Sequence, residues 1–270
     1  MSNASVMNFG LIIVGDEILS GKRQDKHLPK VIELLGARGL ALSWARYVGD
    51  DRRLITAALR DAFASGDAVF SCGGIGATPD DHTRQCAAAA LGVDLALHPE
   101  AKALIIQRMQ EQAAEKGVAF EPDAPDNLHR LNMGVFPAGA SIIANPFNRI
   151  PGFSVGDVHF VPGFPVMAHP MIETLLDTRY PALHGSQRVT ERSVIVYGAM
   201  EASLTPLMEA IEREHAGVRV FSLPSVDHPV HGRHIELGVK GAAADVPTAY
   251  AELRRGLSAL DAKTGPELVR

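Results

Sequence analysis

Ala68-Val-Phe-Ser-Cys-Gly-Gly-Ile-Gly-Ala-Thr-Pro-Asp-Asp-His-Thr-Arg84 is the stretch that decides the fold. Its apolar start, Ala68–Cys72, predicts a buried strand. Three glycines follow, Gly73, Gly74 and Gly76, and the residues from Pro79 to Leu91 predict a helix. A strand, a glycine turn and a helix N-terminus together suit a phosphate group, because free backbone N–H groups and the helix dipole both favour negative charge.

Two carboxylates, Asp80 and Asp81, stand in this turn. Because carboxylates repel a bare phosphate, they indicate a bridging cation such as Mg²⁺. A structural interpretation is also open, since Thr78-Pro79-Asp80-Asp81 matches a capping box in which the Asp81 side chain bonds back to Thr78. The pattern alone leaves the two interpretations equally open.

The residues before this stretch alternate between strand and helix patterns. Strands are predicted at Phe9–Val14 and Leu40–Val48, with helices over about residues 26–38 and 52–64. Three such alternations predict a parallel sheet with right-handed crossovers.

An acidic pair follows each of the three strands, namely Asp16-Glu17, Asp50-Asp51 and Asp80-Asp81. The carboxyl ends of parallel strands meet at one edge of a sheet, which is where such sheets place their ligands. Any one pair is also suited to cap a helix. Three pairs at equivalent positions favour a site for a metal ion and a phosphate.

Composition limits the class of protein. The chain has 270 residues, of which 46% are hydrophobic and 21% charged, as in a globular protein. A net charge of −5 argues against nucleic-acid or anionic-membrane partners. The two cysteines, Cys72 and Cys86, form no metal-binding or CxxC pattern. No Lys or Arg precedes Lys22, so a secretory signal is not expected, and we predict a cytoplasmic protein.

The second half of the chain predicts further elements and a domain boundary. Strands are expected at Ser141–Ala144 and Val158–Val161, helices over about residues 101–116 and 166–176, and a loop over residues 122–127. Two Pro-Gly turns, at Gly152 and Gly163, can bring backbone close to the same ligand. The pattern breaks near residues 178–186, which predicts domains over residues 7–180 and 186–262.

The pattern of the second domain predicts the order strand, helix, strand, strand, helix, which is that of a small α+β module. Its histidines His228, His231 and His234 recur every third residue, which invites a metal-site interpretation. In an extended strand His231 faces away from the other two, so we expect the edge of a hairpin instead.

Four ordered motifs resemble those of the competence/damage-inducible protein A family. They are Gly15-Asp-Glu-Ile-Leu-Ser-Gly21, the glycine turn at residues 73–84, Asn145-Pro-Phe-Asn-Arg-Ile-Pro-Gly-Phe153 and Pro162-Gly-Phe-Pro165. Asn148 replaces a family glycine, which narrows backbone access to a phosphate at that loop. The resemblance does not extend to the nicotinamide-nucleotide amidase domain of longer members, so we do not expect that activity.

The resemblance implies a three-layer α/β/α sandwich with a mostly parallel sheet, the molybdopterin-binding fold, followed by a small KH-like domain. It implies a molybdopterin or nucleotide ligand. Relatives form dimers or trimers, so a homo-oligomer is expected.

Site residues are expected in three groups. Asp50, Asp51 and Asp81 are the catalytic candidates. Asp16, Asp80 and Asp81 are candidate ligands of Mg²⁺ or Mn²⁺. The candidates for phosphate binding are Gly73, Gly74, Gly76, Thr78, Asn145, Gly152 and Gly163.

Three functions are compatible with these groups. Metal-dependent hydrolysis of a nucleotide phosphoanhydride, as in ADP-ribose, is the leading hypothesis. The alternatives are adenylyl transfer to a pterin and pterin or nucleotide binding without catalysis.

Overall fold

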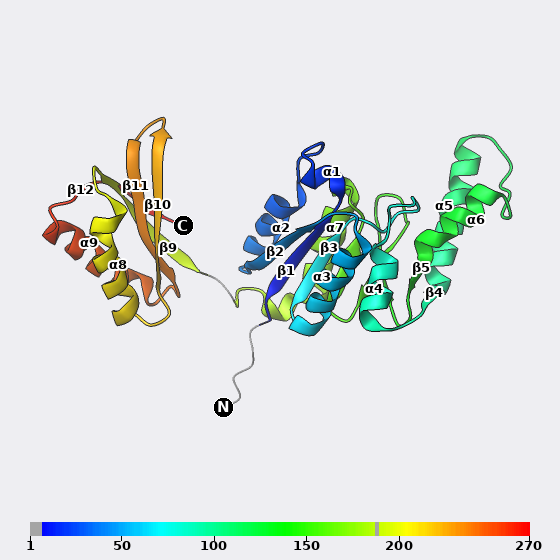
Figure 1. Ribbon diagram of the computed structural model, residues 1–270, viewed down its shortest axis with the longest axis horizontal. Helices are drawn as coiled ribbons and strands as arrows, with labels where there is room; N and C mark the ends of the chain where they lie inside the picture. Colours follow the sequence, from blue (N-terminus) through cyan, green and yellow to red (C-terminus); the bar gives the residue numbers. More distant parts are fainter. Residues whose placement is uncertain (1–6, 187–188) are drawn as a thin grey trace, which may run out of the picture. The chain divides into compact units, whose positions relative to one another are not determined.

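Every residue of strands β1 (Phe9–Val14) and β3 (Ala68–Cys72) is buried, as expected for central strands covered on both faces. They belong to a computed structural model that describes residues 7–186 and 189–270 (Figure 1). The chain divides between Gly185 and Ser186 into two compact units. The predicted second domain includes residues 187 and 188, which lie outside the described residues.

The larger unit is built on a six-stranded sheet in the order β2-β1-β3-β8-β7-β6. The first four strands in this order are parallel to one another. Strand β7 pairs antiparallel with both of its neighbours, β8 and β6. The remaining strands are β2 (Leu42–Val48), β6 (Ser141–Ile143), β7 (Gly152–Val155) and β8 (Val158–Val161). The prediction of a mostly parallel sheet is confirmed.

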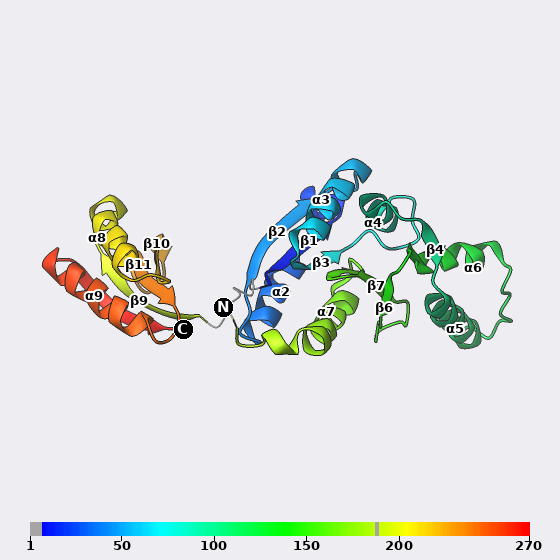
Figure 2. The same cartoon turned by 90° about the horizontal axis from the view of Figure 1, so that it is seen from below.

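Helices cover both faces of this sheet (Figure 2). Alternate residues of β1 point to opposite faces, so Leu11 packs with α2 (His27–Gly36) and α7 (Pro165–Arg179), while Ile12 packs with helices of the other face. Those helices are α3 (Arg52–Ser65) and α4 (Thr83–Leu91). The three-layer α/β/α sandwich is therefore confirmed.

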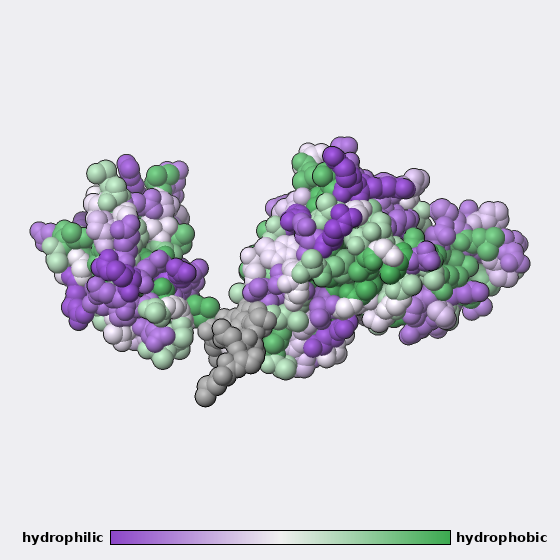
Figure 3. All heavy atoms as spheres, turned by 60° about the horizontal axis from the view of Figure 1, so that its bottom comes forward, coloured by the Kyte–Doolittle hydropathy of each residue, from purple (hydrophilic) through white to green (hydrophobic). Residues whose placement is uncertain are grey.

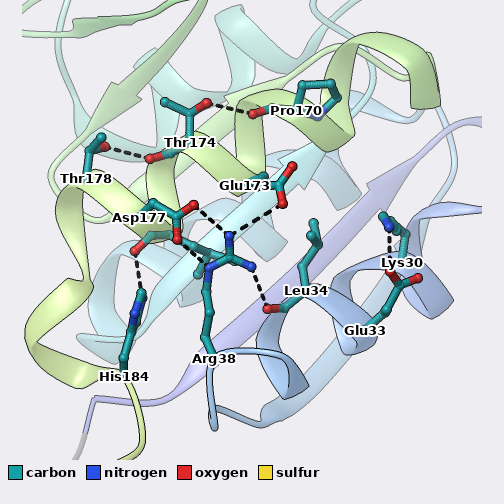
Figure 4. Close-up of polar contacts among 11 residues, drawn as sticks. Lys30, Glu33, Leu34, Arg38, Pro170, Glu173, Thr174, Asp177, Thr178 and His184 are labelled. Atoms are coloured by element: carbon teal, nitrogen blue, oxygen red, sulfur yellow. Dashed lines mark hydrogen bonds and ion pairs between the residues drawn. The ribbon is translucent and has the colours of Figure 1, made fainter.

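Arg38 joins α2 to α7 on one face of the sheet (Figure 4). Its Nε and Nη2 donate to the two carboxylate oxygens of Asp177 at 2.6 and 2.7 Å, and its Nη1 donates to the Leu34 carbonyl at 2.9 Å. Glu173 adds a longer ion pair at 3.6 Å. The planar guanidinium thereby fixes the distance between the end of α2 and the last turn of α7.

A smaller two-stranded sheet extends the larger unit. Its strands are β4 (Leu95–Leu97) and β5 (Val135–Pro137), and the neighbouring helices are α5 (Pro99–Glu115), α6 (Pro125–Arg130) and η1 (Leu131–Gly134). The loop expected over residues 122–127 is wrong in its last part, because α6 begins at Pro125. Proline suits the first helical position, where no N–H bond is required.

Helix α4 begins four residues later than the sequence pattern predicts, at Thr83 rather than Pro79. The Asp81 N–H bonds to the Thr78 carbonyl at 3.0 Å, which closes a separate turn over these residues. The Thr83 N–H bonds to the Gly74 carbonyl at 3.0 Å and ties the first helical residue to the glycine turn. Thr78 is therefore not a helix cap, although Asp81 does bond back to it.

The second unit is a four-stranded antiparallel sheet in the order β10-β11-β9-β12. Its elements are β9 (Thr190–Tyr197), α8 (Glu201–Glu214), β10 (Arg219–His228), β11 (Gly232–Gly241), α9 (Val246–Ala259) and β12 (Lys263–Val269). Leu204 and Ile211 of α8 and Leu253 of α9 pack onto one face of this sheet, the face that carries Val194 and Leu237. Strand β12 was not predicted, since its short polar sequence contains Gly265 and Pro266. The KH-like relationship stays a prediction.

The three histidines of the β10–β11 hairpin lie together, because His231 belongs to the turn and not to an extended strand. Their ring centroids are 4.9 to 5.6 Å apart. The chain reverses between His228 and His231, and the backbone N–H of His231 donates to His228 Nδ1 at 3.1 Å. The hairpin edge that we expected is present.

The surface of the larger unit carries a patch of hydrophobic residues in the view of Figure 3, whereas hydrophilic residues cover much of the rest of that face. Exposed hydrophobic side chains close to the carboxyl ends of the sheet include Leu19, Phe147, Phe164 and Val166. Among the described residues, no helix is both long and apolar enough to cross a membrane.

Candidate functional site

A cavity of about 480 Å³, here called the main cavity, lies at the carboxyl ends of the parallel strands. Its wall includes Gly15 after β1, Asp50 after β2, Gly73 after β3 and Gly163 after β8. Four strand ends therefore contribute to one cavity, as is usual for ligand sites in open α/β sheets.

Most of the residues predicted for the site line this cavity, namely Asp50, Gly73, Gly74, Gly76, Thr78, Asp80, Asp81, Asn145 and Gly163. Three predicted residues do not line it: Asp16, Asp51 and Gly152. The tertiary structure thus brings together predicted residues as far apart in the chain as Asp50 and Gly163.

The glycine turn has a backbone that only glycine adopts readily. Gly73 and Gly74 have φ of +106° and +69°, and a Cβ on Gly74 would meet the Thr83 hydroxyl. Within the described residues, no protein acceptor binds the N–H groups of Gly74, Ile75 and Gly76. These groups are free to donate to oxygens of a ligand in the main cavity.

The side chains of Arg84 and His129 hold carbonyl groups of this turn. The Nη2 of buried Arg84 donates to the Gly76 carbonyl at 2.5 Å, and its Nη1 donates to the Asn132 carbonyl. His129 Nε2 donates to the Ala77 carbonyl at 2.7 Å. Since the C=O and N–H of one peptide point in opposite directions, holding the Gly76 and Ala77 carbonyls orients the peptides that carry the N–H groups of Ala77 and Thr78, at the end of the turn.

Asp81 organises the end of the same turn. Its Oδ2 accepts hydrogen bonds from the Thr78 N–H, at 2.8 Å, and from the Thr78 hydroxyl. Its Oδ1 accepts no hydrogen bond from the described residues, and Asp81 lines the main cavity. The structural interpretation of Asp81 and the functional one are therefore compatible.

Asp50 and Asp16 join the ends of β2 and β1. The Asp16 N–H donates to Asp50 Oδ2 at 2.9 Å, and the Asp50 N–H donates to Asp16 Oδ1 at 3.2 Å. Partial burial raises the pKa of Asp50, and the negative charges of Asp16, Glu17 and Asp80 raise it further. Acidic residues that follow β1 and β3 therefore act electrostatically on Asp50.

Two predicted residues have local structural roles. Asp51 is the N-cap of α3, where its side chain accepts from the Leu54 N–H at 2.9 Å. Gly152 is a buried residue of β7, and a Cβ there would meet the Phe160 carbonyl on the neighbouring strand. The structure places both outside the main cavity.

Asn145 lines the main cavity, but its amide holds its own loop. Its Nδ2 donates to Asn148 Oδ1 at 2.8 Å and to the Ile150 carbonyl at 2.9 Å, and its Oδ1 accepts from the Phe147 N–H. The Asn145 side chain thus shapes the loop, and contact with a phosphate would come from the neighbouring backbone.

The donors present fit a hard divalent cation. Within the described residues, no group of three or more His, Cys, Asp or Glu is arranged to hold a metal ion by itself. Mg²⁺ is usually held by one or two carboxylates together with substrate phosphates and water, rather than by a cage of protein ligands. Asp50, Asp80 and Asp81 supply carboxylate oxygens beside the phosphate-binding turn, which suits that arrangement.

Sequence reasoning missed several residues of the site. Arg84 and His129 support the turn, and Arg23, Phe164 and Met167 line the cavity. Arg84 stands inside the stretch that decides the fold, but its burial and its carbonyl partners depend on η1, more than forty residues later. No local pattern marks the other four.

The family model described as "Probable molybdopterin binding domain" matches residues 10–184 of this chain. These residues hold the sheet, the glycine turn and the whole main cavity. The chain belongs to this family. The resemblance drawn from the four sequence motifs is thereby confirmed at the level of the domain.

Individual relatives agree with this assignment. A CinA-like protein of Geobacter sp. (strain M21) is 32% identical over 266 residues, which are 94% of this chain and 59% of that protein. A Pyrobaculum calidifontis protein is 31% identical over 236 residues, 83% of this chain and 85% of its own length. The chain thus spans about three fifths of the length of the CinA-like relative.

A crystal structure of CinA from Thermoplasma acidophilum, described as a protein of unknown function, superposes with a TM-score of 0.53 and 29% identity. It covers 63% of this chain and 97% of that chain. The similarity confirms the fold of the larger unit and does not identify a reaction.

Proposed function

We propose that the molybdopterin-binding-type unit is a metal-dependent hydrolase of nucleotide phosphoanhydrides, acting on a dinucleotide such as ADP-ribose. One observation carries this proposal. Unpaired N–H groups of the glycine turn and the carboxylates of Asp50, Asp80 and Asp81 line the same cavity. A site that only bound phosphate would gain nothing from three carboxylates, because they repel the ligand unless a cation lies between them.

Each group has a distinct part in this proposal. The N–H groups of Gly74, Ile75 and Gly76 bind phosphate oxygens, and Thr83, which donates to the Gly73 and Gly74 carbonyls, keeps the first two oriented. Asp80 and Asp81, which line the cavity from the turn, would hold the metal ion. When bound, Mg²⁺ or Mn²⁺ would neutralise charge at phosphorus and lower the pKa of a bound water.

Asp50 is the residue that we assign to proton transfer. Its raised pKa and its partly buried position bring its proton affinity closer to neutral pH than that of an ordinary aspartate. A carboxylate of that kind can accept a proton from an attacking water.

Phosphorus NMR of the purified protein with ADP-ribose, FAD, coenzyme A and ATP tests this proposal. We expect cleavage of at least one of the four compounds with Mg²⁺ or Mn²⁺ and none with EDTA. Absence of cleavage for all four compounds in the presence of either metal would overturn it.

A second candidate function is adenylyl transfer to a pterin, which the description of the matching family favours because it names molybdopterin. Under this alternative, the same turn binds the phosphates of ATP. ATP consumption that requires added molybdopterin would select it over hydrolysis. Ligand binding without turnover and without metal would favour a sensor.

We further propose that the protein works as a homo-oligomer, a dimer or trimer, in the cytoplasm on a small-molecule ligand. Size-exclusion chromatography with light scattering measures the oligomeric state directly. A mass of 28.8 kDa, that of one chain, would contradict this part of the proposal.

A further inference from the structure

A second cavity, here called the annex, opens beside the main cavity. Its volume is about 330 Å³, and the two cavities share Val14, Glu17, Arg23 and Gly163 in their walls. A ligand whose phosphoanhydride lies at the glycine turn can therefore continue into the annex without leaving the protein surface.

The annex has an apolar floor and a cationic rim. The floor includes Ile13, Ile18 and Cys72, which belong to or pack against the core under α2. The rim carries Arg23 and Lys26, both exposed, from the loop between α1 (Asp16–Leu19) and α2. Neither cation has a carboxylate partner among the described residues.

The acidic residues near the annex either accept hydrogen bonds from other residues or lie at its boundary with the main cavity. Asp25 is absent from the annex wall, and its oxygens accept from the His27 N–H at 2.8 Å, the Leu28 N–H at 3.1 Å and the Tyr47 hydroxyl at 2.8 Å. Glu17 is the one described carboxylate in the annex wall, at the boundary with the main cavity. The sign of the charge thus changes from negative at Asp50 and Asp80 to positive at Lys26.

A polar atom of the annex wall also has no partner. His27 is 4% exposed, and its Nε2 donates to the Gly163 carbonyl at 3.0 Å. Its Nδ1 is then an acceptor, and no donor among the described residues reaches it. Apart from the cations, the annex therefore offers an uncompensated acceptor and the amide of Gln24.

We infer that the annex binds a phosphomonoester carried by the nucleotide at a distance from its phosphoanhydride. A phosphomonoester carries a charge of about −1.5 to −2 at neutral pH. Arg23 and Lys26 together offer that much positive charge, and the guanidinium and ammonium donors suit phosphate oxygens. The inference rests on the proposed function, because the annex opens from the same cavity.

Matched ligand pairs test the inference. Coenzyme A and NADP⁺ each carry one phosphomonoester that dephospho-coenzyme A and NAD⁺ lack. Isothermal titration calorimetry in Mg²⁺ and in EDTA gives the four dissociation constants, and phosphorus NMR shows whether a ligand is cleaved. We expect the phosphorylated member of at least one pair to bind at least fivefold more tightly.

Two single-charge variants locate the effect. Lys26→Met should reduce that preference to less than twofold. Lys22→Met, which removes the same charge from the same loop at a residue outside both cavity walls, should keep it. No preference in the parent protein, no measurable binding of any of the four compounds, or an equal loss in both variants would each overturn the inference.

The outcomes also separate the inference from the proposed function. A preference that depends on Lys26 without cleavage of any ligand would support the annex and contradict the hydrolase. Cleavage of ADP-ribose without any preference within the pairs would support the hydrolase and contradict the annex.

Discussion

Asp81 both shapes the glycine turn and carries a charge into the main cavity, and two substitutions separate these roles. In Asp81→Asn, the amide oxygen can still accept both bonds from Thr78, while the charge is lost. We expect turnover to fall by at least about 100-fold, as for loss of an electrostatic contact to a transition state, with little change in thermal stability.

Asp81→Ala is the matched control, because it removes the acceptor as well. It should lower the free energy of unfolding by about 0.5–2 kcal/mol, the cost of a lost capping-type hydrogen bond. If Asp81→Asn destabilises the protein as much as Asp81→Ala does, the carboxylate is structural and the functional assignment is wrong.

Gly74 tests the other half of the site. Gly74→Ala forces a Cβ into the left-handed region at φ +69° and against the Thr83 hydroxyl. We expect it to lower the free energy of unfolding more than Gly66→Ala does. Gly66 has φ +73° with open space around it, so alanine there costs only the conformational term of about 1–2 kcal/mol. Urea denaturation measures both variants. Equal losses would show that the contact with Thr83 does not constrain the turn.

At the scale of elements, the contact between α2 and α7 depends on a guanidinium rather than on apolar side chains alone. Arg38→Met removes two hydrogen bonds to Asp177 and one to the Leu34 carbonyl. Asp177 is half exposed, so solvent screening reduces the gain. We expect a loss of about 1–2 kcal/mol in the free energy of unfolding.

Lys30→Met, on α2 itself, provides the comparison. It breaks the more exposed Lys30–Glu33 pair, which we expect to be worth at most about 0.5 kcal/mol. Chemical denaturation at low and high salt distinguishes the two. Similar losses for both variants would mean that the Arg38 geometry contributes nothing beyond an ordinary surface pair.

Strands β7 and β8 and the end of α7 share a buried polar chain that makes stability depend on pH. Tyr180 donates to Asp157, His159 Nε2 donates to the Tyr180 hydroxyl at 2.5 Å, and the Ser154 hydroxyl donates to His159 Nδ1 at 2.7 Å. Burial, reinforced by the charge of Arg179, lowers the pKa of His159 to about 3. The folded protein therefore keeps this imidazole neutral where the unfolded chain takes up a proton.

The contribution of His159 to stability should be complete above about pH 6.5, the ordinary pKa of histidine, and should fall as the pH drops toward 3. The expected slope for this one group is about 1.4 kcal/mol per pH unit. His159→Gln should flatten that part of the profile, measured by urea denaturation between pH 7 and 4. A variant with the parent slope would assign the pH dependence to other groups.

At the scale of the whole molecule, each unit has its own hydrophobic core. The clusters of the larger unit contain no residue beyond Leu183, and the cluster of the second unit contains none before Val194. Separate cores predict two unfolding transitions in calorimetry. Leu253→Ala, in the core of the second unit, should lower only one of them, by about 2–5 kcal/mol of its stability.

A ligand of the main cavity should raise the other transition, because every residue of its wall lies in the larger unit. A single transition that Leu253→Ala and ligand shift together would show instead that the two units unfold as one. The absence of any ligand-dependent shift would count against the main cavity as a binding site.

Local sequence patterns were sufficient for the central elements. Strands β1, β3 and β8 have the predicted boundaries, because mainly apolar runs that end at a glycine or a proline have few other solutions. A predicted boundary was wrong where a contact outside the helix decided it, as at α4, whose first residue bonds to the Gly74 carbonyl. Strand β12 was missed because its pairing with β9, not its own composition, makes it a strand.

The sequence by itself determined the alternating α/β architecture, the glycine turn and the acidic residues after three strands, since each depends on residues close together in the chain. Only the tertiary structure decided which of those residues share a cavity. It placed Asp50 and Asp81 in one wall, left Asp51 as a helix cap and Gly152 inside a sheet, and added Arg84, His129 and the cationic annex. The reason is physical: a side chain's partners across the fold depend on how the sheet and helices pack, and no local period encodes that packing.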